Sequence, residues 1–301
     1  MPLPFVKAEG TGNDFVVVDL RPGRPGARAG GPSPEDPAVV RAICDRHFGV
    51  GADGVLAILP SATGDARMRV LNADGSEAEM CGNGLRCVAK VLYESDPALR
   101  RPTLQIETGA GVLTCLLEVA DGAVRTVTEE MGRPRLTRAE IPLAPGGGEP
   151  AARALREPIR ARDREFRFTA VSMGNPHAVI FVDGEDDLRA LATGYGPVLE
   201  VADRFPRRAN VEFARVRGQE IDLAVWERGS GLTLACGTGA CATVVAACLE
   251  GRLAPGVETP VHLPGGTLAI TVAPDYAGVR LRGPARIAFQ GTLEDAQLAA
   301  R

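Results

Sequence analysis

The sequence predicts an α+β fold with two pseudo-symmetric domains, each a mostly antiparallel or mixed sheet wrapped around a central buried helix. Two glycine-flanked cysteines, in residues 80–84 and 235–239, each follow a strand-like run and open an apolar, helix-like run. The strand-like segment 12–19 resembles segment 174–183, and each precedes its cysteine by 60 to 70 residues. This spacing indicates two copies of one large unit rather than a short-period repeat. Sheets with short connections fit it better than a doubly wound parallel sheet.

The first elements follow from alternation and from turn residues. Residues 5–9 and 15–19 predict a hairpin around Gly10-Thr11-Gly12. Residues 21–34, rich in Pro, Gly and Arg, predict an exposed loop. Ser33-Pro34-Glu35-Asp36 predicts a helix start, because it offers a capping hydroxyl, a proline and then acids. The residues at helical spacing after it are Val40, Ile43, Cys44 and His47.

Further strands are predicted near residues 55–59 and 67–71. Cys81 then stands just before a helix whose apolar residues are Leu85, Val88, Ala89 and Leu92. Residues 103–107 and 112–119 predict a second hairpin around Gly109-Ala110-Gly111. The stretch 144–150 is interpreted as a Gly/Pro linker or loop.

The second half of the chain repeats this order. Its predicted strands are residues 165–172, 178–182, 211–216 and 221–226. Cys236 then opens a helix, 240–249, that is apolar all round and is therefore expected inside its domain. Residues 261–289 return to alternating strands separated by Gly and Pro.

Composition excludes several classes of function. A formal net charge of -4 and the lack of a Lys/Arg cluster argue against a nucleic-acid partner. No apolar run has the length of a membrane span, and the first residues lack the pattern of a signal peptide. Lys7 and Lys90 are the two lysines, which disfavours a Schiff-base enzyme with pyridoxal phosphate. Seven cysteines, an odd number, indicate reduced cytoplasmic thiols.

The two glycine-flanked cysteines predict acid–base chemistry. A cysteine at a helix start lies near the positive end of the helix dipole and near unpaired N–H groups, which favour the thiolate. The same N–H groups can bind a carboxylate. Two such sites facing each other could hold one carboxylate and place a sulfur on each face of the adjacent carbon. One thiolate would then remove the α-proton while the opposite thiol delivers another, which inverts the centre.

The other five thiols are interpreted as packing residues. Cys44, Cys115 and Cys248 lie within apolar patterns, and Cys87 and Cys241 lie inside the two predicted helices. Neither pair of neighbouring cysteines has Cys-x-x-Cys spacing, and the chain has three histidines, so no metal site is predicted.

The chain resembles the diaminopimelate epimerase family in a set of motifs that follow in the family's order over nearly its whole length. They are Gly12-Asn13-Asp14-Phe15, Phe48-Gly49-Val50-Gly51-Ala52-Asp53-Gly54, Asn72-Ala73-Asp74-Gly75-Ser76, Met80-Cys81-Gly82-Asn83-Gly84-Leu85-Arg86-Cys87, Val171-Ser172-Met173-Gly174-Asn175-Pro176-His177, Arg208-Ala209-Asn210-Val211, Trp226-Glu227-Arg228-Gly229 and Ala235-Cys236-Gly237-Thr238-Gly239-Ala240-Cys241.

The resemblance implies an isomerase, independent of any cofactor, that interconverts LL- and meso-2,6-diaminopimelate for lysine and peptidoglycan synthesis. It also implies a homodimer. We place the domain that carries Cys81 at residues 1–131 plus 279–301, and the domain that carries Cys236 at residues 132–278.

The resemblance also implies the role of individual residues. Cys81 and Cys236 would be the base and acid. Backbone donors to the reacting carboxylate would come from Gly82, Asn83, Gly237 and Thr238. Glu227 and the Arg228 main chain would hold the reacting ammonium, and His177 and Glu227 would adjust the thiol pKa values. The residues for the distal amino-acid end would be Asn72, Asn175, Asn210 and the Arg228 guanidinium, with Asn13 lining the pocket.

Gly54 departs from part of the family, since some members carry a glutamine there, and it is assigned no side-chain contact. Segments 21–34 and 144–164 match no motif and are assigned no function.

Two other functions stay open from sequence. The first is a related two-thiol racemase for proline, hydroxyproline or histidine, although proline-type enzymes lack the distal set of amides. The second is a non-catalytic thiol protein that responds to oxidation.

Overall fold

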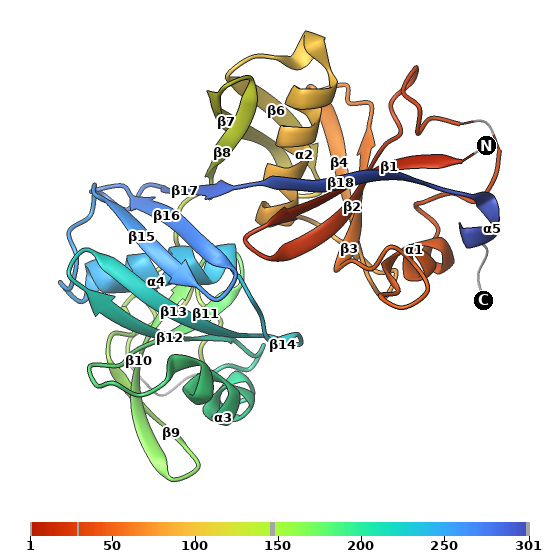
Figure 1. The fold of residues 1–301 in the computed structure, drawn as a ribbon. Helices are drawn as coiled ribbons and strands as arrows, with labels where there is room; N and C mark the ends of the chain where they lie inside the picture. The colour runs from red at the N-terminus through yellow and green to blue at the C-terminus, as the bar shows by residue number, and fades with distance from the viewer. Residues whose placement is uncertain (1, 29, 145–147, 299–301) are drawn as a thin grey trace. The chain divides into compact units, whose positions relative to one another are not determined.

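The computed structural model describes residues 2–28, 30–144 and 148–298, and the chain forms two compact units. Unit 1 comprises the residues up to Glu129 together with those from Gly283 onward, and unit 2 comprises Glu130–Arg282. Both units are mixed sheets around helices, so the predicted α+β class is confirmed (Figure 1).

The helices of unit 1 are α1 (Pro37–Cys44), α2 (Gly82–Ser95), the short 3₁₀ turn η1 (Pro97–Leu99) and α5 (Asp295–Leu298). Its strands are β1 (Leu3–Gly10), β2 (Asn13–Asp19), β3 (Gly54–Leu59), β4 (Ala66–Asn72), β5 (Glu77–Ala78), β6 (Thr103–Thr108), β7 (Gly111–Ala120), β8 (Ala123–Glu130) and β18 (Arg286–Leu293).

The helices of unit 2 are α3 (Leu188–Glu200) and α4 (Gly237–Leu249). Its strands are β9 (Glu157–Ala161), β10 (Arg164–Ser172), β11 (Pro176–Phe181), β12 (Asn210–Arg217), β13 (Glu220–Glu227), β14 (Gly231–Leu232), β15 (Glu258–Leu263), β16 (Gly266–Val272) and β17 (Val279–Pro284), the last of which ends at the boundary of the unit.

Strand pairing is the same in both units. In unit 1, β1 pairs antiparallel with β2, β2 parallel with β3, and β3 antiparallel with β4. In unit 2, β10, β11, β12 and β13 pair in the same three ways. β4 and β13 each pair with a short antiparallel strand and with one parallel strand, β6 or β15. The two sheets are therefore copies of one topology.

The C-terminal strand completes the first copy. β18 pairs antiparallel with β1, and β9 pairs antiparallel with β10 in the second copy. The edge that β9 covers from within unit 2 is thus covered in unit 1 by residues from the end of the chain. This pairing explains why the chain returns to unit 1 after Arg282.

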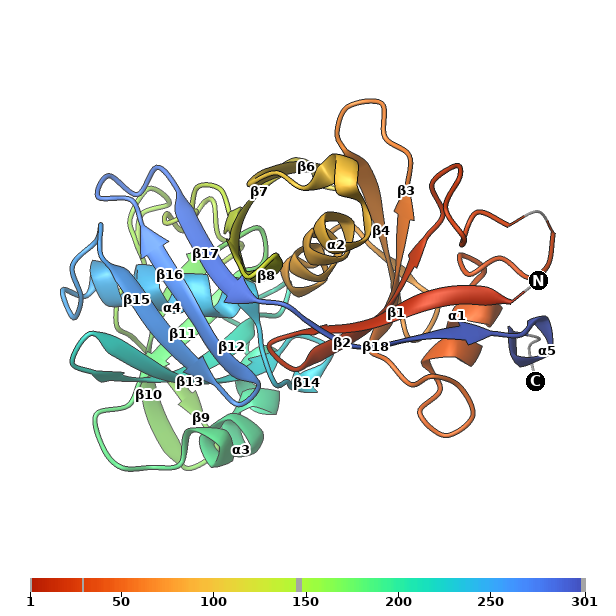
Figure 2. The same ribbon diagram turned by 45° about the horizontal axis from the view of Figure 1, so that its top comes forward.

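Each sheet encloses one helix of the predicted kind. Strands curve around α2, which Figure 2 shows nearly end-on, and its residues Asn83–Leu92 are buried. In α4 the residues Gly239–Cys248 are buried, which confirms the prediction for a helix that is apolar all round. Complete burial of a Val or Leu side chain stabilises by roughly 1.5–3 kcal/mol, so these helices anchor the two cores. No helix in the described residues is both long and apolar enough to span a membrane.

The predicted start and end of the first helix are wrong. The helix begins at Pro37, because the Asp36 carboxylate accepts a hydrogen bond of 2.8 Å from the Ala38 N–H. Asp36-Pro37 thus provides the cap and proline that were assigned three residues earlier. The helix ends at Cys44, and His47 lies outside it, where its N–H donates to the Asp45 carboxylate.

Helix α3 was not predicted from the sequence, because Gly194, Gly196 and Pro197 interrupt its pattern. Gly196 is required by packing: a Cβ atom there would lie 2.5 Å from the Trp226 side chain. Strands β8 and β9 were missed as well. The predicted linker 144–150 includes residues 145–147, which lie outside the described residues.

Candidate active site

Cys81 is the N-cap of α2. Its backbone is extended (φ -143°, ψ 113°), and its sulfur accepts a hydrogen bond of 3.5 Å from the Gly84 N–H. A thiol therefore occupies the place where a helix usually carries a serine or aspartate cap. The first backbone N–H groups of α2, including those of Gly82 and Asn83, have no partner within the helix and can bind an anion.

Asn13 links this thiol to the start of the helix. Its Oδ1 lies 3.7 Å from the Cys81 sulfur and accepts a hydrogen bond of 3.2 Å from Asn83 Nδ2. Its Nδ2 donates to Asp53 at 2.6 Å. The side chain is thus held from both ends beside Cys81.

The segment before Gly54 keeps Asn13 in place through charge. Arg46 binds Asp53 and Asp14, each at 2.7 Å, and Lys7 binds Asp14 at 2.5 Å. Burial raises the pKa of Asp14, but the hydrogen bonds from Arg46 and Lys7 prevail and lower it to about 2. The motif around Gly51 therefore supports the first Gly-Asn element.

Asn72 ends β4 opposite Gly54. Its side chain donates a hydrogen bond of 3.0 Å to Ser76 Oγ, and its backbone closes the turn that contains Gly75. The turn interpretation of this asparagine is therefore supported, and its half-buried side chain remains a candidate for binding.

Sequence reasoning gave no role to Arg86 and Glu129, which form a buried pair between α2 and β8. Both side chains are inaccessible to solvent, and Arg86 donates to Asn83 Oδ1 at 2.6 Å and to Thr11 at 3.1 Å. Burial raises the pKa of Glu129 to about 7, against the charge of Arg86 at 3.5 Å. An arginine inside an apolar helix was the available signal.

Cys236 is the N-cap of α4 with nearly the same backbone (φ -129°, ψ 107°). Its sulfur lies 3.3 Å from the Gly239 nitrogen and 3.5 Å from Thr238 Oγ1. Burial, followed by the carboxylates of Glu227 and Glu212, raises the pKa of Cys236 well above its usual range, despite those two donors. Burial and the two carboxylates therefore favour the neutral thiol over the thiolate.

Behind Cys236 lies a line of polar side chains. His177 Nδ1 is 2.7 Å from Glu212, and His177 Nε2 is 3.0 Å from Asn175 Oδ1. Asn175 Nδ2 in turn lies 3.4 Å from Thr238 Oγ1. Glu212, which sequence reasoning missed, is buried completely, and burial raises its pKa against the charge of His177.

Glu227 stands at the end of β13, nine residues before Cys236. Its Oε1 accepts a hydrogen bond of 2.5 Å from Thr233. Burial raises the pKa of Glu227, while hydrogen bonds from Thr233 and Cys236 lower it. A buried carboxylate in contact with a thiol is suited to hold a cation or to share a proton.

Arg228 and Asn210 belong to the same cluster. Asn210 Oδ1 accepts a hydrogen bond of 2.8 Å from the Arg228 N–H. The Arg228 guanidinium donates a hydrogen bond of 3.1 Å to the Arg207 carbonyl. Arg228 also lines a cavity of about 370 Å³ together with Arg135 and Arg207. Glu140 lines the same cavity, and three arginines against one glutamate leave an excess of positive charge that favours a carboxylate ligand.

The structure groups the predicted site residues by unit. Unit 1 brings Asn13, Cys81, Gly82 and Asn83 together, while the hydrogen bonds of Asn72 lie within its own turn. The residues that cluster in unit 2 are Asn175, His177, Asn210, Glu227, Arg228, Cys236, Gly237 and Thr238. The other five cysteines are buried, as their interpretation as packing residues requires.

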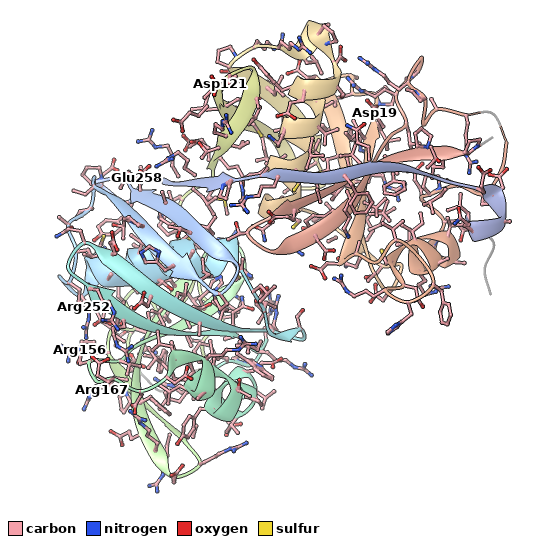
Figure 3. The ribbon with its side chains drawn as sticks, in the orientation of Figure 1. Asp19, Asp121, Arg156, Arg167, Arg252 and Glu258 are labelled. Atoms are coloured by element: carbon pink, nitrogen blue, oxygen red, sulfur yellow. The ribbon has the colours of Figure 1, made fainter. Side chains whose placement is uncertain are left out.

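A second cavity in unit 2, of about 380 Å³, contains no predicted site residue. Arg156, Arg167 and Arg252, labelled in Figure 3, line it. Arg252 is neutralised there by Glu250 at 2.9 Å and by Asp183 at 3.0 Å.

Comparison with known proteins gives one consistent family. The family model described as diaminopimelate epimerase matches residues 5–137 and 169–288. The diaminopimelate epimerase of Pelotomaculum thermopropionicum is 48% identical over 95% of this chain and 97% of its own length. That of Geobacillus kaustophilus is 46% identical over 95% of both chains.

Solved structures share the fold at lower sequence identity. A hydroxyproline epimerase from Agrobacterium vitis matches with a TM-score of 0.66 and 16% identity, over 97% of this chain and 91% of its own. A PhzF-family phenazine biosynthesis protein from Bacillus anthracis matches with a TM-score of 0.64 and 15% identity, over 98% and 99%. These likenesses establish the architecture of the sheets and helices.

Proposed function

Because this chain belongs to the diaminopimelate epimerase family, we propose that it interconverts LL- and meso-2,6-diaminopimelate. The observation that carries the proposal is the pair of cysteine N-caps, each of which joins a thiol to unpaired helix N–H groups at the same place in two copies of one topology. The reaction needs a base and an acid of the same kind, and the chain supplies a thiol for each.

Cys81 and Cys236 exchange these two roles. In one direction a thiolate takes the α-proton, the C–H electron pair remains on carbon as a carbanion, and the other thiol donates its proton to the opposite face. The first sulfur is then a thiol and the second a thiolate, which is the state needed for the reverse reaction. No cofactor takes part in these proton transfers.

The reacting carboxylate binds the N–H groups of Gly82, Asn83, Gly237 and Thr238. These groups carry the positive ends of α2 and α4, so they stabilise the charge that builds up beside the α-carbon. Placing donors where the charge develops is usually the largest single contribution to catalysis.

Glu227 and the Arg228 main chain hold the reacting ammonium. The raised pKa of Cys236 has Glu227 among its causes. A substrate ammonium beside Glu227 would neutralise that carboxylate, which lowers the pKa of Cys236 and favours the thiolate. His177 is connected to the same thiol through Asn175 and Thr238. Substrate binding would thus prepare the base.

The distal amino-acid end binds Asn72, Asn175, Asn210 and the guanidinium of Arg228, with Asn13 lining the pocket. Support comes from the cavity that Arg228 lines with two other arginines. A planar guanidinium binds a carboxylate through two parallel hydrogen bonds, whereas a substrate without a distal carboxylate leaves that group unpaired.

The test is incubation of the protein with LL-diaminopimelate in deuterated water. Meso product with solvent deuterium at one α-carbon is expected, and meso substrate should give the LL isomer labelled in the same way. Absence of exchange with both isomers would exclude the function. A substrate panel with proline, hydroxyproline and histidine belongs in the same experiment, since a preference for one of them would assign the chain to a mono-amino-acid racemase.

We also propose that the protein acts as a cytoplasmic homodimer in the synthesis of lysine and peptidoglycan precursors. The family supports this assignment, and the exposed Phe289 on β18 provides an apolar contact for a second copy. Light scattering of the purified protein measures its mass directly, and a value near 31.5 kDa at micromolar concentration would contradict the dimer.

A further inference from the structure

We propose that Glu212 is a positioning residue that acts on Cys236 through His177. The proposal rests on the function proposed above, in which Cys236 must become a thiolate. Glu212 lies on β12 and His177 on β11, next to each other in one parallel pair of strands.

The pair is not needed for the fold. Burying a carboxylate costs several kcal/mol unless it is paired and hydrogen-bonded. Glu212 Oε2 has no hydrogen-bond partner among the described residues. In unit 1 the equivalent positions, by strand register, hold Phe15 and Leu56, so that copy of the topology forms without an ion pair at these two positions. The polar pair therefore serves a purpose beside Cys236.

The hydrogen bonds of His177 determine its protons. An amide oxygen can only accept, so His177 Nε2 carries a hydrogen toward Asn175 Oδ1 at 3.0 Å. One more proton fills the 2.7 Å contact between Nδ1 and Glu212, and it resides on either the ring or the carboxyl group. Both arrangements leave the pair without net charge and fix the direction of the Nε2–H bond.

The orientation of the Nε2–H bond determines the hydrogen bonds of Asn175 and Thr238, which connect His177 to the Cys236 sulfur. Asn175 accepts from His177, which turns its Nδ2 hydrogens toward Thr238 Oγ1 at 3.4 Å. Because Thr238 accepts there, its single hydroxyl hydrogen is available to Cys236 at 3.5 Å. The Gly239 N–H is the second donor at 3.3 Å. Donors to sulfur favour the thiolate. An unpaired Glu212 carboxylate would instead raise the pKa of Cys236. Because the proton shared with His177 leaves the pair without net charge, the effect of Glu212 that remains is the orientation of these donors.

Glu212 also touches the helix start itself. A Cβ atom on Gly239 would lie 3.0 Å from Glu212 Oε1 and 3.2 Å from the Cys236 sulfur. The ionisable groups that face Cys236 are Glu227 from β13 and Glu212 from β12, with His177 from β11 behind them.

Three variants test the proposal. Glu212→Leu removes the group that orients His177. The double variant His177→Phe with Glu212→Leu installs the residues of unit 1 and removes both groups that orient Asn175. Replacing a buried ion pair with packed apolar residues is often neutral for stability, so this variant is expected to keep its melting temperature even where the single variant unfolds. Glu212→Gln keeps a hydrogen-bonding group on Nδ1.

The main readout is the rate at which iodoacetamide alkylates Cys236, measured by peptide mass spectrometry without substrate in a Cys81→Ser background. Loss of one oriented hydrogen bond is expected to slow alkylation about tenfold in Glu212→Leu and at least as much in the double variant. Glu212→Gln is expected to stay within about threefold of the parent. The kcat for epimerisation, measured with Cys81 restored, should follow the same order.

Glu250→Gln is the matched control, because Glu250 is a carboxylate of unit 2 that binds Thr169 and Arg252 instead. Its alkylation rate should equal that of the parent. Parent-like alkylation in folded Glu212→Leu and in the double variant would overturn the proposal. Equal losses in Glu212→Gln and Glu212→Leu would also overturn it, since charge rather than orientation would then be the cause. Because alkylation needs no substrate, these outcomes are distinct from a failure of the proposed reaction.

Discussion

Cys81 and Cys236 occupy the same place in two copies of one topology, but their surroundings differ. Each caps a helix, and each sulfur accepts from the N–H group three residues later. Beside Cys81 the sheet carries Phe15 and Leu56, whereas beside Cys236 it carries His177 and Glu212. The shared topology therefore accounts for the position of each thiol, and the side chains around it determine how readily that thiol loses its proton.

Both units nevertheless bury a carboxylate next to the start of the helix. In unit 1 Glu129 lies 3.0 Å from a Cβ atom placed on Gly82, and in unit 2 Glu212 lies 3.0 Å from one placed on Gly239. Glu129 faces an arginine and Glu212 a histidine. An arginine keeps its charge at every physiological pH, while a histidine can gain or lose a proton. The two buried carboxylates thus have partners of different kinds, a permanent positive charge for Glu129 and an imidazole ring for Glu212.

Removal of either thiol has the largest expected effect. Cys81→Ala and Cys236→Ala should each lower kcat for epimerisation by about 10³-fold, within the range for loss of a general acid or base. Each variant keeps one base, so it should still exchange the α-proton of one isomer with deuterated water, and the two variants should prefer opposite isomers. Nuclear magnetic resonance of each isomer follows the exchange.

Cys87→Ala is the matched control, since Cys87 is buried six residues further along the chain in α2. It should retain parent activity. If both site variants exchanged the same isomer, the assignment of one thiol to each face would be wrong.

The second prediction concerns how the buried carboxylate of unit 1, Glu129, changes the stability of the protein with pH. Burial raises the pKa of Glu129 from its ordinary value of 4.5 to about 7. The native state therefore holds this proton more tightly than the unfolded state, so the stabilisation is complete below pH 4.5 and is lost as pH rises through 7. In Glu129→Gln this contribution is absent. Between pH 5 and pH 8 the free energy of unfolding of the variant should rise, relative to the parent, by about 2–3 kcal/mol.

Urea unfolding of both proteins at the two pH values measures the difference. Glu118→Gln is a suitable control, because Glu118 is an exposed carboxylate of the same unit. A constant difference between Glu129→Gln and the parent across this range would mean that Glu129 is ionised throughout.

Most of the fold could be predicted from the sequence, because the two copies repeat the same landmarks in the same order. Alternation identified the main strands, and the all-apolar run after Cys236 identified a buried helix. Helix α3 was not predicted, because Gly196 lies within it to make room for the Trp226 side chain. From sequence alone, a glycine required by packing cannot be distinguished from a glycine required by a turn. The sequence analysis also assigned no role to Glu212. Residues Asn210–Ala214 are all buried, so a charged residue in this strand does not point to solvent.

The candidate site was predicted less completely than the fold. Motifs gave the residues that would contact a substrate, since those motifs follow in the family's order before and after each cysteine. The residues behind them, Arg86, Glu129 and Glu212, belong to no spacing pattern, and their partners lie far away in the sequence. Arg86 and Glu129, for example, are 43 residues apart. Such pairs can be identified only once the structure shows which strands and helices lie next to each other.

The third prediction compares the residues that follow the last residues of β4 and β13, which are Asn72 and Glu227. Asn72 is followed by Ala73, whereas Glu227 is followed by Arg228. Arg228→Lys keeps the charge and loses the planar fork, so it should raise KM for diaminopimelate by about 10²-fold, with a smaller change in kcat. Steady-state kinetics separate the two constants. Arg156→Lys, in the second cavity of unit 2, should leave both unchanged. An unchanged KM in Arg228→Lys would place the distal carboxylate elsewhere.

The smallest expected effect comes from replacing the third residue of each helix, Gly84 in α2 and Gly239 in α4, with alanine. These two variants compare the surroundings of the two helix starts directly. A Cβ atom on Gly84 would lie 3.0 Å from a terminal methyl group of Leu56, which can rotate away. A Cβ atom on Gly239 would meet Glu212 Oε1 at 3.0 Å and the Cys236 sulfur at 3.2 Å, and both are held by hydrogen bonds. Gly239→Ala should therefore lower kcat about tenfold and Gly84→Ala about twofold, although overpacking should destabilise both by roughly 1–3 kcal/mol. Kinetics and thermal unfolding of the two variants, measured in parallel, test this difference. Equal losses of kcat at equal stability would mean that the polar surroundings of Cys236 are no more sensitive to displacement than the apolar surroundings of Cys81.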